Sequence, residues 1–265
     1  MAHKTVVSLF LLTMVIFLLS PSLLPAKAHA SSPVHTNTSY NMLSMNEQLC
    51  LTPDCLHMQP SSVQKVAYLT FDDGPNRYTP QIMNILREKG VKATFFVIGI
   101  HIARSPQIMK QITDEGHYVG LHSMSHNAQY LYSGDPHILI AEMEETKRAV
   151  QATSGFRTQL IRVPYGSKPY LTDAYRNALA QANFKLWDWT VDTGDWRKTS
   201  TPASVLQQVM MTAKRNTEVI LMHDCEITVQ ALPKIIDYLT EQGYTLKAYN
   251  PYSHTEVNFW HDARL

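Results

Sequence analysis

The chain has 265 residues, of which 45% are hydrophobic and 17% are charged, and its formal net charge is +1. This composition fits one large globular domain with a substantial core. No run or stripe of Lys and Arg occurs, so the sequence lacks the electrostatic footprint of a nucleic-acid-binding protein.

The first 30 residues have the pattern of an export signal. After Lys4 no charged residue occurs until Lys27, the span 6–19 is almost continuously apolar, and 28–30 (Ala-His-Ala) fits a small-residue cleavage site. The uncharged span is also long enough for an uncleaved membrane anchor, although two prolines interrupt it. We therefore expect a secreted or extracytoplasmic protein, in the cell wall or anchored outside the cytoplasm, that meets a membrane only through this segment.

Residues 31–64 are rich in Ser, Thr, Asn, Pro and Met and lack periodicity, which indicates a stalk or linker. This segment holds Cys50 and Cys55, whereas the third cysteine, Cys225, lies far away. In an oxidising exterior a short Cys50–Cys55 loop can form and would leave Cys225 unpaired, but the sequence leaves the pairing open. The catalytic domain is expected at 65–250, with a C-terminal tail at 251–265.

From residue 66 onwards, strand-like and helix-like segments alternate. Apolar runs typical of buried strands lie at 66–71, 93–98, 117–121, 160–163, 184–191, 219–222 and 244–248. Amphipathic patterns typical of helices lie at 80–89, 106–115, 136–153, 172–182, 202–214 and 229–241. This alternation predicts parallel strands with right-handed crossovers, and seven strands rather than eight predict a distorted (β/α)7 barrel of the α/β class.

Polar clusters follow five of the predicted strands. In chain order they are Asp72-Asp73, His122-x-x-x-His126, the segment 162–166, the segment 192–196 and the segment 221–224. Because the active site of a (β/α) barrel is built at the C-terminal ends of its strands, these clusters are expected to converge on one rim.

The residue types on this rim indicate metal-assisted hydrolysis. His122 and His126 are four residues apart, so on a helical turn they share one face, and Asp73 completes a set of two His and one carboxylate. Zn²⁺ suits this set, as do other first-row divalent ions such as Co²⁺ or Mn²⁺. Asp72, expected to face away from Asp73 on an extended chain, can take a proton from water, and His223 can deliver one to a leaving group. Together these roles describe amide or ester hydrolysis.

The ordered segments 70–75, 122–126, 162–166, 192–196 and 221–223 resemble the five motifs of NodB-type polysaccharide deacetylases, carbohydrate esterase family 4. The resemblance covers about residues 64–250 and extends to bacterial peptidoglycan N-acetylglucosamine deacetylases. It implies a distorted (β/α)7 barrel (the NodB homology domain) and metal-dependent removal of N-acetyl groups from an amino-sugar polymer, peptidoglycan or a chitin-like polysaccharide.

The resemblance also implies a role for each matching residue. Asp72 corresponds to the general base, His223 to the general acid, and Asp73, His122 and His126 to the metal ligands. Arg162 corresponds to the arginine that orients the base, and Asp195 to the aspartate that tunes the acid. The backbone N–H of Tyr165, beside Pro164, corresponds to an oxyanion donor. Trp196 and Leu221 match a groove position and an acetyl-methyl pocket, and ordinary core packing is the competing interpretation for both.

Two departures and several alternatives accompany this interpretation. Val163 stands where many relatives have a second proline, and Cys225 directly follows His223-Asp224. A chitooligosaccharide or exopolysaccharide deacetylase, or an O-acetyl esterase acting on xylan, could use the same rim, and a catalytically silent wall-binding module is the alternative of a different class. The export signal and short stalk favour peptidoglycan. His101, His117 and His137 fall in no motif and are interpreted as surface or structural residues. The sequence does not give the oligomeric state.

Overall fold

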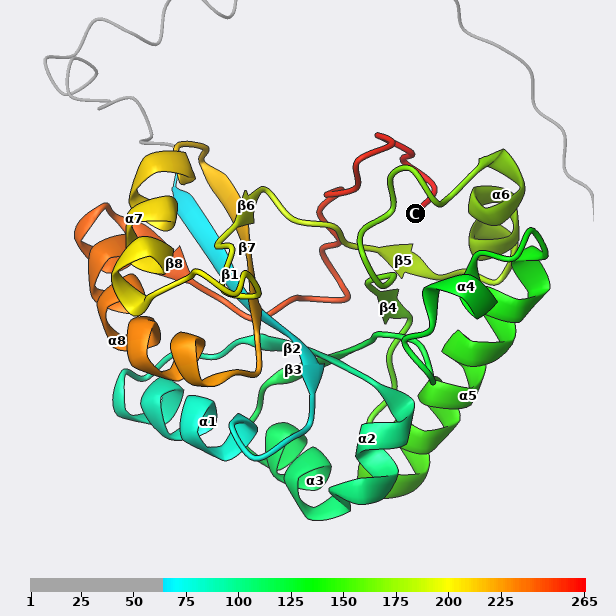
Figure 1. The fold of residues 1–265 in the computed structure, drawn as a ribbon, viewed down its shortest axis with the longest axis horizontal. Helices are drawn as coiled ribbons and strands as arrows, with labels where there is room; N and C mark the ends of the chain where they lie inside the picture. The colour runs from blue at the N-terminus through cyan, green and yellow to red at the C-terminus, as the bar shows by residue number, and fades with distance from the viewer. Residues whose placement is uncertain (1–63) are drawn as a thin grey trace, which may run out of the picture. The chain divides into compact units, whose positions relative to one another are not determined.

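The computed structural model describes residues 64–265 and shows one curled parallel sheet with helices around its outside (Figure 1). The strands are β1 (Lys65–Gly74), β2 (Thr94–Val97), β3 (Tyr118–Leu121), β4 (Leu160–Ile161), β5 (Lys185–Leu186), β6 (Val191–Asp192), β7 (Thr217–His223) and β8 (Tyr244–Leu246). The sheet order is β5-β4-β3-β2-β1-β7-β6, with β8 pairing the start of β1, and every pairing is parallel. This arrangement confirms the predicted α/β barrel class.

The helices follow the predicted pattern closely. They are α1 (Thr79–Glu88), α2 (Gly99–Arg104), α3 (Pro106–Asp114), α4 (Ala128–Leu131), α5 (Pro136–Ser154), α6 (Asp173–Gln181), α7 (Pro202–Thr212) and α8 (Glu226–Glu241). The sequence analysis missed α2 and α4, which are too short to show a helical period. Proline occupies the first turn of α3, α5 and α7, where its fixed φ and missing N–H are tolerated.

The predicted strand at 184–191 is the one that the structure divides. Its ends form β5 and β6, but the residues between them leave the sheet and pair with the C-terminal segment instead. Trp187 forms an isolated parallel bridge with Val257, and the N–H of Asp188 donates to the carbonyl of Val257 at 2.7 Å. Among the described residues no pairing joins β5 to β6, so the barrel is open on this side.

Strand β1 runs through the centre of the sheet and determines where the site forms. Its side chains alternate between two faces, as an extended chain requires. Ala67, Leu69 and Phe71 are fully buried in the core beneath the helices. On the opposite face Tyr68 packs edge-on against Trp187, with ring centroids 5.0 Å apart, and Asp72 ends the row. The inner face of β1 therefore carries a carboxylate to the C-terminal end of the sheet.

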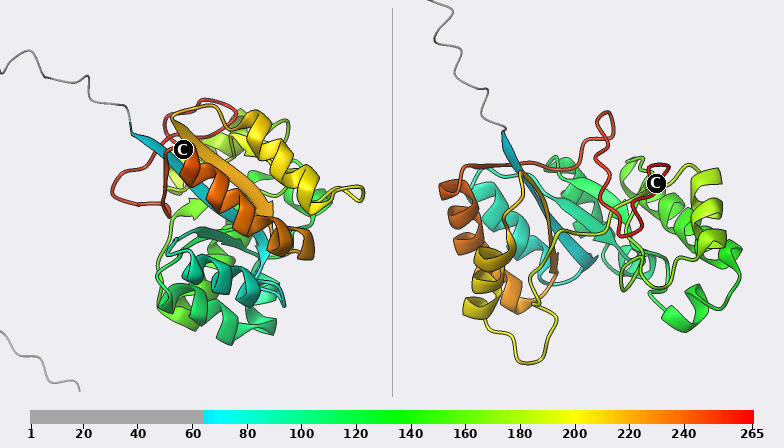
Figure 2. Two further views of the ribbon diagram at one scale, coloured as in Figure 1. Left: turned by 90° about the vertical axis from the view of Figure 1, so that its left-hand side faces the viewer. Right: turned by 90° about the horizontal axis from the view of Figure 1, so that it is seen from above.

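The segment 251–265 packs against the domain. The indole Nε1 of Trp187 donates to the carbonyl of Thr255 at 2.7 Å, and the N–H of Phe259 donates to the Asp188 carboxylate at 2.7 Å. Leu265 is fully buried in the core. The packed structure thus continues beyond residue 250, where the sequence analysis placed the end of the domain (Figure 2).

The expected signal segment, nearly all of the expected stalk, and Cys50 and Cys55 lie outside the described residues. Within residues 64–265, no helix combines the length and the apolar character needed to cross a membrane.

Leu265→Ala should lower the free energy of unfolding by about 2–4 kcal/mol, because it removes buried methyl groups and leaves a cavity. Tyr252→Ala is the matched control, since the Tyr252 side chain is 97% exposed. Denaturant unfolding followed by circular dichroism measures both. Equal stability of Leu265→Ala and wild type would mean that the C-terminal segment does not contribute to the core.

Candidate active site

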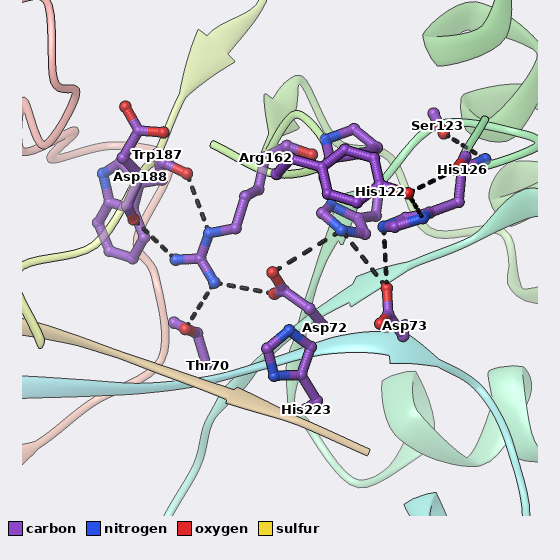
Figure 3. Close-up of polar contacts among 12 residues, drawn as sticks. Thr70, Asp72, Asp73, His122, Ser123, His126, Arg162, Trp187, Asp188 and His223 are labelled. Carbon is purple, nitrogen blue, oxygen red and sulfur yellow. Dashed lines mark hydrogen bonds and ion pairs between the residues drawn. The ribbon is translucent and has the colours of Figure 1, made fainter. Parts of the chain in front are cut away.

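The polar clusters meet at an open cleft of about 820 Å³ at the C-terminal ends of the strands. The cleft is lined by both carboxylates of β1, both predicted histidine ligands and the predicted acid histidine. These residues follow strands that are far apart in the sequence. The predicted site residues among its lining are Asp72, Asp73, His122, His126, Tyr165, Asp195, Trp196, Leu221 and His223. Figure 3 shows the side chains at its floor.

Asp72 and Asp73 approach the same imidazole, which corrects the expectation that they point in opposite directions. The Nε2 atom of His122 lies 3.8 Å from Asp72 Oδ2 and 3.5 Å from Asp73 Oδ1. The register of β1 against β2 shifts between Asp72 and Gly74, and Asp73 has a φ of 71°. Strict alternation does not survive such a bulge, so both carboxylates reach the cleft.

The segment from His122 to His126 is a loop, not the helical turn that the sequence analysis assumed. Ser123 and His126 have φ values of 64° and 56°, and the Oγ of Ser123 accepts the N–H of His126 at 2.9 Å. Glu142 on α5 accepts the N–H groups of residues 124–125 at 3.0 and 2.9 Å. The buried Glu142 carboxylate therefore fixes the loop, and the two rings converge through loop geometry.

Asp73, His122 and His126 form a group that could hold a metal ion, with one ligand atom from each lying within 4.8 Å of the others. Asp73 Oδ1 lies 3.3 Å from His126 Nε2 and 3.5 Å from His122 Nε2. A tetrahedral Zn²⁺ site with bonds of roughly 2.0–2.1 Å requires ligand atoms about 3.4 Å apart. Asp73 Oδ1 is also buried without a hydrogen-bond partner among the described residues, as an oxygen reserved for a cation would be.

The protonation of the two imidazoles suits metal binding. His122 Nδ1 lies 2.7 Å from the carbonyl oxygen of Arg162. A carbonyl can only accept, so Nδ1 carries a proton and Nε2 is the nitrogen that faces Asp73. Burial lowers the pKa of His126, and the neighbouring His122 lowers it further. The lowered pKa of His126 favours the neutral form that a metal ligand needs.

A buried arginine holds Asp72. Arg162 has no exposed surface, and its Nη1 donates to Asp72 Oδ1 at 2.8 Å and to Thr70 Oγ1 at 2.7 Å (Figure 3). Its Nε and Nη2 donate to the carbonyls of Trp187 and Asp188 at 3.0 and 2.8 Å. Burial lowers the pKa of Arg162, while the charge of Asp72 opposes this shift. The guanidinium thus leaves Asp72 Oδ2 to face the cleft.

A buried aspartate holds His223 on the other side of the cleft. Asp195 Oδ1 accepts from His223 Nδ1 at 2.8 Å, and its Oδ2 accepts the backbone N–H of His223 at 2.6 Å and the hydroxyl of Thr228. Burial by itself lowers the pKa of His223, but the hydrogen bond and charge of Asp195, with smaller contributions from Asp72 and Asp73, raise the pKa to about 9. His223 therefore carries a proton at neutral pH.

Of the remaining predicted residues, Tyr165, Leu221 and Trp196 line the cleft, whereas Pro164 does not. Tyr165 has a φ of 67° and a half-exposed ring, whose hydroxyl lies 3.3 Å from His126 Nδ1. Pro164 is buried, and its carbonyl accepts the hydroxyl of Tyr132 at 2.7 Å. Leu221 is buried on β7, whereas Trp196 is 58% exposed and donates from Nε1 to Asp192 at 3.2 Å. Its exposure excludes core packing as the explanation for Trp196.

Sequence reasoning missed several polar residues around this site. His101 Nδ1 lies 2.8 Å from the carbonyl oxygen of Asp73, although the sequence analysis assigned it no role. Asp224 is buried, which raises its pKa to about 7, and it accepts the hydroxyl of Thr79. Only its position directly after His223 could have indicated it. By contrast, His117 is buried just before β3, at the end of that strand away from the site, where it accepts the N–H of Ala93 at 3.2 Å. His137 is exposed.

Cys225 lies beside the His223–Asp195 pair at the start of α8. Its Sγ is 3.4 Å from the hydroxyl oxygen of Thr228 and 3.9 Å from Asp195 Oδ2. Burial and the charge of Asp195 raise the pKa of the thiol, so it is not a reactive thiolate at neutral pH.

Comparison with known proteins agrees with this geometry. The polysaccharide deacetylase family profile matches residues 60–187. The chain is 44% identical to a peptidoglycan-N-acetylglucosamine deacetylase of Bacillus cereus over 208 residues, which are 76% of each protein, and 38% identical to the putative polysaccharide deacetylase YheN of Bacillus subtilis over 92% of this chain and 89% of that one.

Solved structures give the same result. The crystal structure of the polysaccharide deacetylase Bc1974 from Bacillus cereus is 44% identical and has a TM-score of 0.73, covering 76% of this chain and 100% of that one. A carbohydrate esterase family 4 pseudoenzyme from Bacillus anthracis, BA3943, is 29% identical with a TM-score of 0.63, over 70% of this chain and 64% of that one. The fold, the five converging motifs and these similarities show that the chain belongs to the polysaccharide deacetylase family, carbohydrate esterase family 4.

Proposed function

We propose that the protein removes N-acetyl groups from N-acetylglucosamine residues of peptidoglycan and releases acetate. The observation that carries this proposal is the placement of two proton-handling groups, Asp72 and His223, in the same cleft as the Asp73–His122–His126 group. Hydrolysis of an amide needs a water that loses a proton and an amine that gains one. The cleft supplies a separate residue for each transfer.

Asp72 acts as the general base in this proposal. Arg162 occupies its Oδ1, so Oδ2 is left to take the proton of the attacking water. The Asp72 side chain is only 4% exposed, which limits competition from bulk solvent. The Tyr165 backbone N–H, at a turn with positive φ on the cleft wall, is the proposed donor to the developing oxyanion.

His223 acts as the general acid. It is protonated at neutral pH because Asp195 stabilises the imidazolium, and its Nδ1 is engaged by that carboxylate. The proton on Nε2 is thus the one available to the departing amine. Leu221, buried at the cleft floor two residues earlier on β7, provides apolar surface for the acetyl methyl group, and Trp196 provides an exposed ring for the sugar.

Asp73, His122 and His126 would hold the divalent ion, for which Zn²⁺ is our choice because of the ligand set and spacing. When bound, such an ion supplies Lewis-acid catalysis, polarising the acetyl carbonyl and lowering the pKa of water. The proposed place of action is outside the cytoplasm, where peptidoglycan lies and where the sequence of residues 1–30 would direct the chain.

The substrate proposal is tested by measuring acetate release from peptidoglycan, chitin oligomers and acetylated xylan in parallel. We expect the highest kcat/KM on peptidoglycan. Chelation should abolish release while circular dichroism stays unchanged, because the core does not depend on the ion, and added Zn²⁺ should restore it. Full activity after verified metal removal would refute the metal-dependent mechanism, preference for xylan would identify an O-acetyl esterase, and no release from any polymer would favour a silent wall-binding module.

Asp72→Asn and Asp73→Ala should differ in their response to metal. Asp73→Ala should weaken metal affinity, and excess metal should partly restore turnover because His122 and His126 remain. Asp72→Asn should bind metal normally yet lose about 10²–10⁴-fold in kcat at any metal concentration, as removal of a general base does. Metal titration with acetate release measures both. Rescue of Asp72→Asn alone would reverse the two assignments.

Asp195→Asn should move the alkaline limit of activity to lower pH. His223 must be protonated to act, so activity should be lost as the pH rises through its raised pKa, which is about 9 without a bound cation. Without the Asp195 charge, burial lowers the pKa of His223, so the alkaline limb of kcat against pH should fall by at least about one unit.

Asp192→Asn is the control for this measurement. Asp192 is a second carboxylate in the cleft, and the hydrogen bonds that its side chain forms go to Gly194 and Trp196, not to His223. Both variants are compared with wild type at equal metal loading, since a bound cation also lowers the pKa of His223. An unchanged alkaline limb in Asp195→Asn would show that His223 is not the acid.

A further inference from the structure

One wall of the cleft carries two cations that the proposed chemistry does not use. Arg197 and Lys198 line the cleft from the segment between β6 and α7, which projects from the domain in Figure 2 (yellow). Both side chains are exposed. Neither forms an ion pair with any residue of the described range 64–265.

Arg197 is held in place by its surroundings. Its guanidinium carbon lies 5.1 Å from the centroid of the Trp196 ring. It also lies against Gly194, because a Cβ at that position would come within 3.2 Å of the guanidinium carbon. Gly194 has a φ of 70°, and its carbonyl accepts the N–H of Arg197 at 3.1 Å. The absence of a side chain at residue 194 thus makes room for the guanidinium.

The two carboxylates nearest in sequence to this cation, Asp195 and Asp192, are already engaged. Asp195 accepts hydrogen bonds from His223. Asp192 accepts the N–H of Gly194 at 2.8 Å and the indole Nε1 of Trp196 at 3.2 Å. Its hydrogen bonds hold the loop and the Trp196 ring, and no ion pair neutralises Arg197. The result is an ordered positive charge beside an exposed aromatic ring at the mouth of the cleft.

This arrangement distinguishes between polymers that the proposed chemistry alone treats alike. Chitin and its oligomers are uncharged, so they offer nothing to a guanidinium. In peptidoglycan each N-acetylglucosamine neighbours a sugar whose 3-O-substituent carries carboxylate groups, either on the lactyl group or on the attached peptide. Arginine suits carboxylates because its planar donors can form paired charge-assisted hydrogen bonds.

We propose that Arg197, assisted by Lys198, binds a carboxylate on the sugar next to the one that is deacetylated. This inference rests on the proposed function. Trp196 then packs against the glycan between this carboxylate and the reacting acetyl group. The pair makes the cleft selective for an anionic glycan over a neutral one. It takes no part in the proton transfers, so it acts on binding and leaves the chemical step unchanged.

The test uses the full chain loaded with Zn²⁺ and three forms of the same glycan strands: peptide-free strands with lactyl carboxylates, the same strands with these groups amidated, and strands that keep their peptides. For wild type, amidation should raise KM about two- to tenfold with little change in kcat, and salt should reduce this difference. Peptide-free and peptide-bearing strands reveal which carboxylate is bound.

Arg197→Gln/Lys198→Gln should raise KM about two- to tenfold on the carboxylated strands and leave KM on the amidated strands unchanged. Arg197→Lys should retain part of the preference. Lys234→Gln is the control, since it removes one exposed positive charge from α8 outside the cleft. Equal effects on both substrates, or no effect on either, would overturn the inference while leaving the deacetylase proposal intact.

Calorimetric binding of the carboxylated and amidated strands is measured beside turnover. If wild type releases no acetate from any strand, the proposed function fails, and binding still decides the role of Arg197. Tighter, salt-dependent binding of the carboxylated strands that disappears in the double variant supports the inference. Equal binding of both strand forms refutes it.

Discussion

The buried contact between Arg162 and Asp72 is the interaction on which the site depends. One guanidinium joins β1, through Asp72 and Thr70, to the two backbone carbonyls where the chain leaves β5. The carbonyl of Arg162 also accepts a hydrogen bond from the imidazole of His122 and so orients this candidate metal ligand. Removing one member of a buried ion pair typically costs about 3–5 kcal/mol because it strands the other charge. Such a pair is therefore better understood as fixing geometry than as adding net stability.

Backbone strain in the described residues is concentrated where the polar groups converge. Six non-glycine residues of the described range have positive φ, and four of them, Asp73, Ser123, His126 and Tyr165, belong to this rim. A left-handed conformation costs free energy for a residue with a Cβ, so it persists only where surrounding contacts enforce it. Here Glu142 enforces the histidine loop and the β1 bulge turns Asp73 toward it. The site is thus assembled by loops held against a rigid sheet.

The sequence predicted the architecture well because apolar periodicity records burial directly. The convergence of Asp72, His122, Asp195 and His223 on one cleft, with Arg162 buried beside Asp72, followed from the placement of their motifs at strand ends. Local geometry was harder to predict. Spacing alone suggested that the histidine pair lies on a helical turn and that the two aspartate side chains point in opposite directions. Both expectations failed because residues with positive φ interrupt the regular backbone and give no periodic signal in the sequence.

Contacts between segments far apart in the chain could not be predicted from the sequence for a different reason. Glu142 lies in the middle of an amphipathic helix, and His101 lies in a helix too short to show a period, so nothing local distinguishes them from surface residues. The packing of Leu265 and the break in the strand at 184–191 have one cause, since residues 187–188 pair with the C-terminal segment. Only the folded chain brings these segments together.

In the proposed mechanism the two proton-handling groups are supported by partners of opposite charge, and this asymmetry would let both work at the same pH. A buried cation, Arg162, faces Asp72, whereas a buried anion, Asp195, faces His223. The arginine donates to Asp72 Oδ1 and leaves Oδ2 to accept a proton, and the aspartate favours the charged imidazolium that can give one. In this proposed mechanism the direction of proton transfer depends on Arg162 and Asp195, two buried residues that hold the reacting groups.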